Sequence, residues 1–154
     1  MSELVLVFVP TSREELVELS AGKPLTCPRS GYCATAELKD TFGLDDEEEA
    51  EFAALQVASV ACLTRQGERV VVTAKLPKSE VRPGADVPNG EVQVRRLVLA
   101  DVEAVFTDEN PQVAQAAARA VVGWDLDAAW SAPEVQHVLN EHDLLWHSVA
   151  ELAS

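Results

Sequence analysis

Three cysteines are the first candidates for chemistry in this sequence, because a thiolate can bind a metal, form a disulfide or attack a substrate. Cys27 and Cys33 have five residues between them, whereas a pair of zinc ligands in a knuckle usually has about two to four. Cys62 falls in an apolar helical pattern, where cysteine packs as a small hydrophobic residue. The odd count also suits no complete disulfide framework. The pattern favours structural thiols, with metal and redox roles as the alternatives.

The histidines are the next candidates, since imidazole is a common metal ligand. His137, His142 and His147 are spaced five residues apart, so on one helix successive rings would point about 140° apart and share no face. Glu134 and His137 have the Glu-x-x-His spacing of di-iron bundles, but such a site needs two copies of this motif and two further glutamates. We therefore predict no bound metal and no cofactor.

An unbroken acidic run from Asp45 to Glu49 offers carboxylates for acid–base catalysis or for binding Ca²⁺ or Mg²⁺. A calcium loop, however, alternates its oxygen ligands along an irregular segment with a central glycine, and this run has neither feature. Carboxylates in the first turn of a helix interact favourably with the helix dipole. The run therefore predicts the start of a long helix.

Short catalytic motifs are absent from the sequence: it has no glycine-rich phosphate loop, no dinucleotide fingerprint, no Gly-x-Ser-x-Gly elbow and no HExxH helix. Enzymes can work without a short motif. The alternative function is therefore an enzyme or small-ligand-binding protein whose site is assembled from separated segments. Glu48, Arg69, Arg95 and His142 are the polar residues that such a cleft would bring together.

Charge narrows the choice of partners. The net charge is −14, and from Asp101 to Ser154 there are ten acidic residues and one basic residue, Arg119. Binding to nucleic acid or to an anionic membrane needs clustered Lys and Arg, so we expect neither as a direct partner. A protein with a basic surface is the expected partner, and a merely solvated acidic surface is the alternative.

Three tryptophans, Trp124, Trp130 and Trp146, lie in the same acidic part of the chain. A ring of this size usually packs in the protein core. An exposed tryptophan among carboxylates is instead typical of a binding hot spot for a basic, apolar surface. We therefore predict that at least one of Trp130 and Trp146 is partly exposed, and that the partner-binding residues are Asp125, Asp127, Trp130 and Trp146.

The secondary-structure pattern indicates one α+β domain over residues 1–154. The apolar run 4–9 predicts a central strand covered on both faces, and Thr11 with Glu14 predicts a capping box for the helix that follows. Residues 46–64 predict one long helix that is apolar on nearly all sides after Glu51, and therefore buried, with Phe52, Leu55 and Cys62 all in the core. Further strands are expected at 32–34, 69–76, 92–95 and 102–106, the last two as antiparallel neighbours, and further helices at 113–122, 125–131 and 134–152.

These elements predict a mixed or mostly antiparallel sheet of four or five strands, with helices packed on its faces around the long buried helix. The opening apolar stretch is too short for a signal peptide and follows acidic Glu3. No run approaches the roughly 18 apolar residues of a spanning helix. A cytoplasmic location is the expectation.

Several segments together resemble an uncharacterised family of actinobacterial proteins, a domain of unknown function. They are Val9-Pro10 after the apolar strand, the acidic helix start running into Phe52-Ala53-Ala54-Leu55, the strand Arg69–Val72, and the late Leu144-Leu145-Trp146. The resemblance spans nearly the whole chain but implies no activity, cofactor or catalytic residue. The chain departs from the pattern at Cys33 and Cys62, which argues against a shared thiol chemistry.

Overall fold

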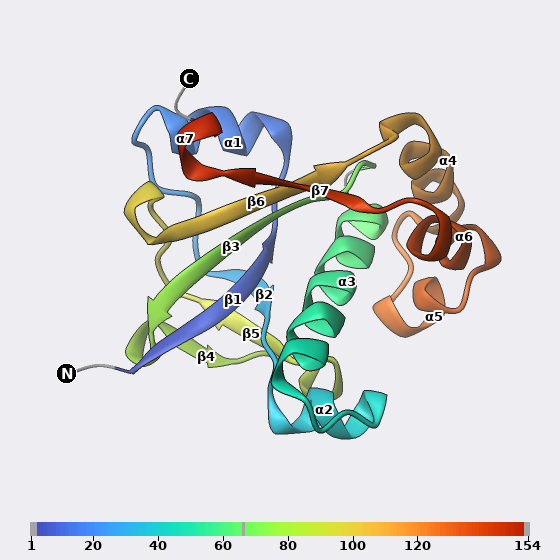
Figure 1. Ribbon diagram of the computed structural model, residues 1–154, viewed down its shortest axis with the longest axis horizontal. Coiled ribbons are helices and arrows are strands. Elements are labelled where there is room, and N and C mark those ends of the chain that lie inside the picture. The colour runs from blue at the N-terminus through green and yellow to red at the C-terminus, as the bar shows by residue number, and fades with distance from the viewer. Residues whose placement is uncertain (1–2, 66, 153–154) are drawn as a thin grey trace.

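A seven-stranded antiparallel sheet forms the centre of the computed structural model, which describes residues 3–65 and 67–152 (Figure 1). The order of the strands across the sheet is β4-β5-β2-β1-β3-β6-β7. An antiparallel α+β fold is confirmed, but the expected count of four or five strands is wrong. The strands are β1 (Leu4–Pro10), β2 (Arg29–Tyr32), β3 (Val70–Pro77), β4 (Val81–Pro83), β5 (Glu91–Val94), β6 (Val102–Asp108) and β7 (Leu144–Ser148).

Seven α-helices lie among the described residues, and none of them is long and apolar enough to cross a membrane. Helix α1 covers one face of the sheet and α3 crosses the other, with α4, α5 and α6 packed beyond α3 (Figure 1). The helices are α1 (Arg13–Ser20), α2 (Ala36–Phe42), α3 (Glu47–Arg65), α4 (Pro111–Val121), α5 (Leu126–Trp130), α6 (Pro133–Glu141) and α7 (Val149–Leu152), with 3₁₀ turns η1 (Lys78–Glu80), η2 (Val87–Asn89) and η3 (Leu99–Asp101).

Strand β1 lies at the middle of the sheet, as its apolar run predicts. Val7 and Val9 belong to the core on the α1 side, and Phe8 belongs to the core beneath α3. Successive side chains of a strand point to opposite faces, so a run with no polar residue fits a strand that is covered on both. The central position of β1 is confirmed.

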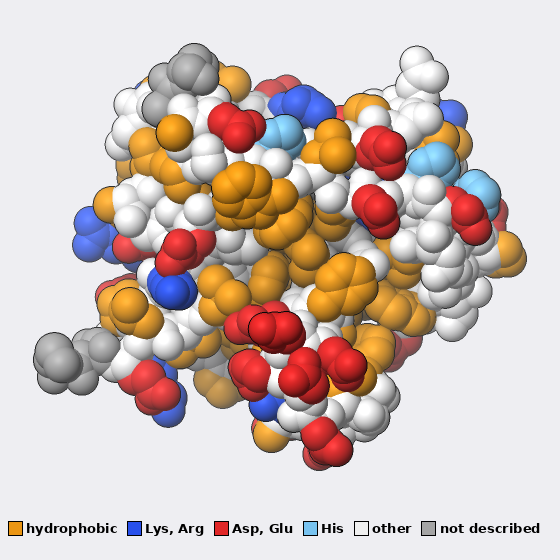
Figure 2. Space-filling view, viewed as in Figure 1, with side chains coloured by type: hydrophobic (Ala, Val, Ile, Leu, Met, Phe, Trp, Pro, Cys, Tyr) orange, Lys and Arg blue, Asp and Glu red, His pale blue; other side chains and the backbone are white. Residues whose placement is uncertain are grey.

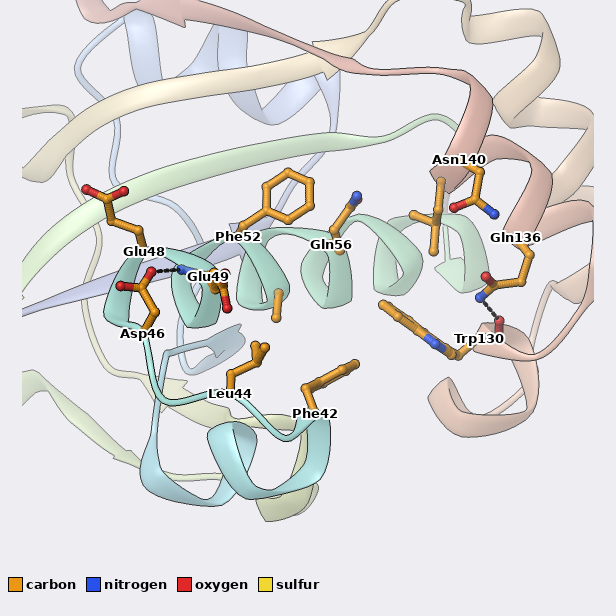
Figure 3. Close-up of a pocket in the computed structure, with 12 residues that line it drawn as sticks. Phe42, Leu44, Asp46, Glu48, Glu49, Phe52, Gln56, Trp130, Gln136 and Asn140 are labelled. Carbon is orange, nitrogen blue, oxygen red and sulfur yellow. Dashed lines mark hydrogen bonds between the residues drawn. The ribbon is translucent and has the colours of Figure 1, made fainter.

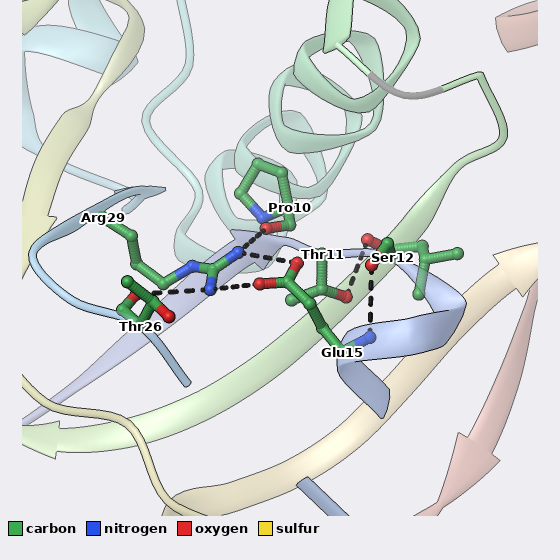
Figure 4. A network of polar contacts seen from close by, with 7 residues as sticks. Pro10, Thr11, Ser12, Glu15, Thr26 and Arg29 are labelled. Atoms are coloured by element: carbon green, nitrogen blue, oxygen red, sulfur yellow. Dashed lines mark hydrogen bonds and ion pairs between the residues drawn. The ribbon is translucent and has the colours of Figure 1, made fainter. Parts of the chain in front are cut away.

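The junction between β1 and α1 differs from the expected capping box. The side chain of Ser12, not Thr11, caps α1 by accepting a hydrogen bond from the Glu15 N–H. Thr11 is buried, and its hydroxyl donates to the carbonyl of Val70. Arg29 joins this junction to β2, because its two terminal nitrogens donate to the two Glu15 carboxylate oxygens at 2.7 and 3.0 Å (Figure 4).

Strands β5 and β6 are not neighbours, contrary to expectation. Strand β5 pairs with β2 and β4, whereas β6 pairs with β3 and β7. The connection between them therefore crosses from one half of the sheet to the other, anchored by Leu97, which is fully buried and accepts a hydrogen bond from the Leu25 N–H. Alternating burial shows that each segment is a strand but does not identify its partner.

The expected helix over residues 134–152 is also wrong. Helix α6 ends at Glu141, and the His142 N–H makes the last helical bond, to the Val138 carbonyl. The chain then extends as β7, pairs with β6, and turns into the short helix α7. The segment 144–148 contains no glycine or proline to mark this change. Pairing with β6 decides its conformation.

Helix α3 is confirmed as the long helix of the core, but its burial is uneven. Leu55 and Cys62 are buried, whereas Phe52 is 59% exposed, so its expected burial is wrong. On the outer side of the C-terminal half of the helix, Val60 and Leu63 are covered by α4, α5 and α6. Phe52 lies in the N-terminal half, whose outer side these helices leave partly uncovered.

Candidate functional site

A groove lies over this uncovered half of α3 and has a volume of about 620 Å³. Figure 3 shows Phe42 and Leu44, from α2 and the loop after it, on one flank and Trp130 of α5 further along the groove. The rings of Trp130 and Phe42 pack edge to face, with centroids 5.4 Å apart. The residues that line the groove are Phe42, Leu44, Asp46, Glu48, Glu49, Phe52, Ala53, Gln56, Trp130, Gln136, Leu139 and Asn140.

Acidic side chains form one end of the groove, at the start of α3. Asp46 caps the helix by accepting from the Glu49 N–H at 2.9 Å. Glu48 and Glu49 make no side-chain hydrogen bond or ion pair with any residue that the structure describes. Burial, and then the charges of the neighbouring Glu47 and Glu48, raises the pKa of Glu51 above its ordinary value. This end of the groove therefore carries a concentrated negative charge.

The surface of the protein also shows apolar side chains next to acidic ones. Figure 2 shows hydrophobic side chains gathered near the middle of this face, with acidic side chains crowded below them over the first turns of α3. Soluble proteins rarely leave large apolar side chains grouped in water without a function for them. The arrangement suits a surface that is apolar and carries positive charge on one side.

Amide side chains form the other end of the groove. Gln136 of α6 donates to the Trp130 carbonyl at 2.6 Å, which ties α6 to the end of α5 (Figure 3). Gln56 of α3 has a buried side-chain oxygen that accepts no hydrogen bond from the described part of the chain. Buried acceptors are nearly always satisfied. This oxygen has almost no accessible surface, so the Gln56 side chain would have to turn before a donor in the groove could reach it.

The predicted partner-binding carboxylates already have contacts within the fold. Asp125 caps α5 by accepting from the Ala128 N–H at 2.8 Å. Asp127 accepts from the side-chain amide of Asn89, also at 2.8 Å. Both are exposed, and both lie on or next to α5, the helix that carries Trp130. They are neighbours of the groove and do not line it.

The two predicted tryptophans lie on different elements. Trp130 is half-buried in the groove, whereas Trp146 is 59% exposed on β7, opposite Phe106 of β6. The expected partial exposure of at least one of them is therefore confirmed. Trp124, at 49%, is also far from buried. Of the four predicted residues, only Trp130 lines the groove.

The four polar residues named for a site assembled from separated segments do not share a cleft. Arg69 is almost fully buried, donates to the Asp108 carboxylate from its Nε at 2.6 Å, and donates to the His142 carbonyl at 2.8 Å. Glu48 lies at the other end of α3, whose 19 residues span about 28 Å. Arg95 is exposed beyond β5, where its backbone N–H bonds to the Glu80 carbonyl. These residues do not converge.

The three histidines do not lie on one helix, as the expected helix over residues 134–152 would have placed them. Because α6 ends at Glu141, the rings of His137 and His142 come together edge to face, with centroids 5.6 Å apart. His147 lies on β7, where its ring nitrogens contact the Thr107 hydroxyl and the Glu151 carboxylate. Within residues 3–65 and 67–152, no three His, Cys, Asp or Glu side chains are grouped closely enough to hold a metal ion.

All three cysteines are free thiols, and burial makes them poor nucleophiles. Burial raises the pKa of Cys33 to about 12 and that of Cys62 to about 11. Cys27 is half-buried, and burial raises the pKa of its thiol as well, with the charge of Arg29 opposing the shift. The reactive species is the thiolate, so little of it is present at neutral pH.

We therefore expect iodoacetamide at pH 8 to alkylate Cys27 first in the folded protein, and slowly. Cys33 and Cys62 should react only after unfolding, because both are buried as well as protonated. Mass spectrometry of peptides from the native and the guanidinium-unfolded protein measures the three rates. Equal native rates at Cys27 and Cys62 would contradict the packing of α3 against β3.

The groove was missed at the level of sequence because its walls come from unrelated segments. Phe42 and Leu44 lie in a short helix and the loop after it, and neither belongs to a periodic pattern. One signal was available: Glu49, Phe52 and Gln56 recur at three- and four-residue intervals, so they lie on one side of α3. A single aromatic residue between two polar neighbours on that side is typical of an exposed position.

Comparison with known proteins places the chain in a family but assigns no activity. No curated protein and no solved structure matches it. One family model, described as a family of unknown function (DUF6912), matches residues 5–154 and confirms the resemblance noted in the sequence. This chain therefore belongs to the DUF6912 family.

Proposed function

We propose that this chain is a small interaction domain that binds a segment of another protein in the groove over α3. The observation that carries the proposal is Phe52, which is 59% exposed in the N-terminal half of the longest helix, between an acidic end and a tryptophan. Burying a phenylalanine side chain fully is worth about 1.5–3 kcal/mol. A partner that covers Phe52 would gain most of this energy.

The side chains that line the groove indicate which residue types the partner segment carries. Phe42, Phe52 and Trp130 provide apolar contact for two or three apolar side chains. Glu48 and Glu49 favour Lys or Arg at the end of the segment that reaches the start of α3. Charge complementarity of this kind mainly sets the association rate and the specificity, while the buried aromatic contacts supply the affinity.

Peptide selection tests the proposal. Peptides of about twelve random residues, selected on the immobilised protein, should combine two or three apolar residues with Lys or Arg. Replacing Phe52 with serine should then weaken their binding at least about tenfold, which corresponds to about 1.4 kcal/mol. Fluorescence anisotropy of a labelled peptide gives the dissociation constant for each variant.

A matched control is available on the opposite face of the sheet. Val17 of α1 is 70% exposed, so Val17→Ser removes an exposed apolar side chain far from the groove and should leave binding unchanged. Reversing charge with Glu48→Lys and Glu49→Lys should slow association and reduce its salt dependence. Selected peptides that bind the Phe52→Ser variant as tightly as the wild type would rule out the groove as the binding surface.

A small ligand is the second candidate for the same groove. Its volume of about 620 Å³ lies within the range of about 300–1,000 Å³ that is common for ligand pockets. Gln56, Gln136 and Asn140 place amide side chains along the lining of the groove, where a ligand of this size would contact them. Mass spectrometry of the natively purified protein separates the two candidates, because a bound metabolite adds a mass that disappears on unfolding.

A further inference from the structure

The two edges of the sheet are protected very differently. Strand β4 has three residues, including Arg82 and Pro83, and short, charged or proline-containing edges resist pairing with other chains. Strand β7 has five residues, Leu144–Ser148, with no proline and no lysine or arginine. It pairs with β6 along one side, and no strand of the described residues pairs with its other side.

Each face of this open edge carries an exposed apolar side chain of β7. Trp146 is 59% exposed and lies opposite Phe106, on the face that α3 covers. Leu145 is 44% exposed and lies opposite Thr107, on the other face. Figure 1 shows β7 running along the outside of the sheet between α7 and α6. An edge with unpaired backbone groups and two exposed apolar side chains is a template for strand addition.

We propose that β7 binds an extended segment of a partner protein, which adds an eighth strand to the sheet. In this mode of recognition, backbone hydrogen bonds supply affinity and alternate side chains supply specificity. Apolar or aromatic residues of the incoming strand would pack beside Trp146 on one face and beside Leu145 on the other. This site is separate from the groove, because no residue of β7 lines it.

The charges around β7 indicate which charge the ends of the incoming strand carry. Glu141 and Asp143 precede β7, and Glu151 follows it, so carboxylates lie at both ends of the edge. Glu151 already contacts His147 at 3.0 Å, so the negative charge that is open to a partner lies at the end that Glu141 and Asp143 precede. A strand with Lys or Arg at the end that reaches these two residues, and apolar residues in the middle, complements this pattern.

A second copy of the chain fits the edge poorly. Each copy carries a net charge of −14, and Glu141 and Asp143 precede this edge in both copies. Like charges brought together across an interface disfavour association. A basic-ended strand from another protein is the occupant that the edge favours.

A synthetic peptide tests the proposal on the intact protein. The probe has a middle of alternating valine and threonine with one tyrosine, and two lysines at each end. We expect saturable binding that slows hydrogen exchange of backbone amides within residues 144–148, measured by nuclear magnetic resonance. A second peptide, with every other backbone N–H in its middle methylated, keeps the side chains but should bind at least tenfold more weakly. A third peptide with glutamates at its ends should also bind at least tenfold more weakly.

Two variants separate this site from the groove. Trp146→Lys should reduce binding of the lysine-ended peptide at least tenfold, whereas Phe52→Ser should leave it unchanged. Equal binding of the methylated and unmethylated peptides would overturn strand addition, and so would protection confined to residues outside 144–148. A stable dimer of the wild type that Trp146→Lys dissociates would overturn the choice of occupant.

Discussion

Replacing Asp108 with alanine should destabilise the folded protein by about 3–5 kcal/mol, because it leaves the Arg69 guanidinium buried without its counter-ion. Both side chains are only 1% exposed. The Asp108 carboxylate accepts from the backbone N–H of Arg69 and from its Nε, and the same guanidinium donates to the His142 carbonyl. The pair therefore joins the start of β3, the end of β6 and the turn before β7. Unfolding in guanidinium chloride, followed by circular dichroism, measures the loss in the free energy of unfolding.

Two controls distinguish a buried pair from a surface pair. Glu103→Ala removes the 3.3 Å contact with Lys75, whose side chain is 55% exposed, and should cost less than about 1 kcal/mol. Replacing both members, with Arg69→Met and Asp108→Leu together, should cost less than Asp108→Ala alone, since no buried charge is left unpaired. If Asp108→Ala cost no more than Glu103→Ala, Arg69 would have to reach water in the folded state.

Elements that depend on local composition were predictable from the sequence. The apolar run of β1 implies burial on both faces wherever the strand lies, and Asn110-Pro111 marks the start of α4 without reference to the rest of the fold. The acidic residues at the start of α3 act through the helix dipole, which is also a local effect. These parts of the prediction agree with the structure to within a few residues.

Elements that depend on distant partners were not predictable. The segment 144–148 begins with three apolar residues and lacks a helix breaker, so its pattern fits either a helix or a strand. Its partner β6 is about 40 residues away in the sequence. The same limit explains why β5 and β6 were expected to pair: the alternation of side chains records which residues are buried but not which strand is adjacent.

The candidate site was predictable only in part. Trp130 and the exposure of Trp146 followed from the grouping of tryptophans and carboxylates late in the chain. The groove itself depends on how far α4, α5 and α6 extend along α3, and tertiary packing alone determines that extent. Counting apolar residues around α3 therefore overestimated its burial at Phe52.

Replacing Leu55 with alanine should destabilise the protein by about 2–5 kcal/mol, because it leaves a cavity in a packed core. Leu55 is only 7% exposed and belongs to the core formed by α3, β1 and β3. Phe52 is the matched control, since it lies three residues away on the same helix and is larger, yet is 59% exposed. Phe52→Ala should cost about 1 kcal/mol or less.

The comparison of these two variants links the fold to the proposed function. A phenylalanine that contributes little to stability and remains largely in water has no structural reason to be there, so a low cost for Phe52→Ala together with weakened peptide binding would assign it to recognition. The urea midpoints of the two variants, compared with that of the wild type, measure how much each substitution costs in stability. If Leu55→Ala hardly moved the midpoint, α3 would not be the centre of the core. If Phe52→Ala cost as much as Leu55→Ala, Phe52 would be buried in solution and the groove would be closed.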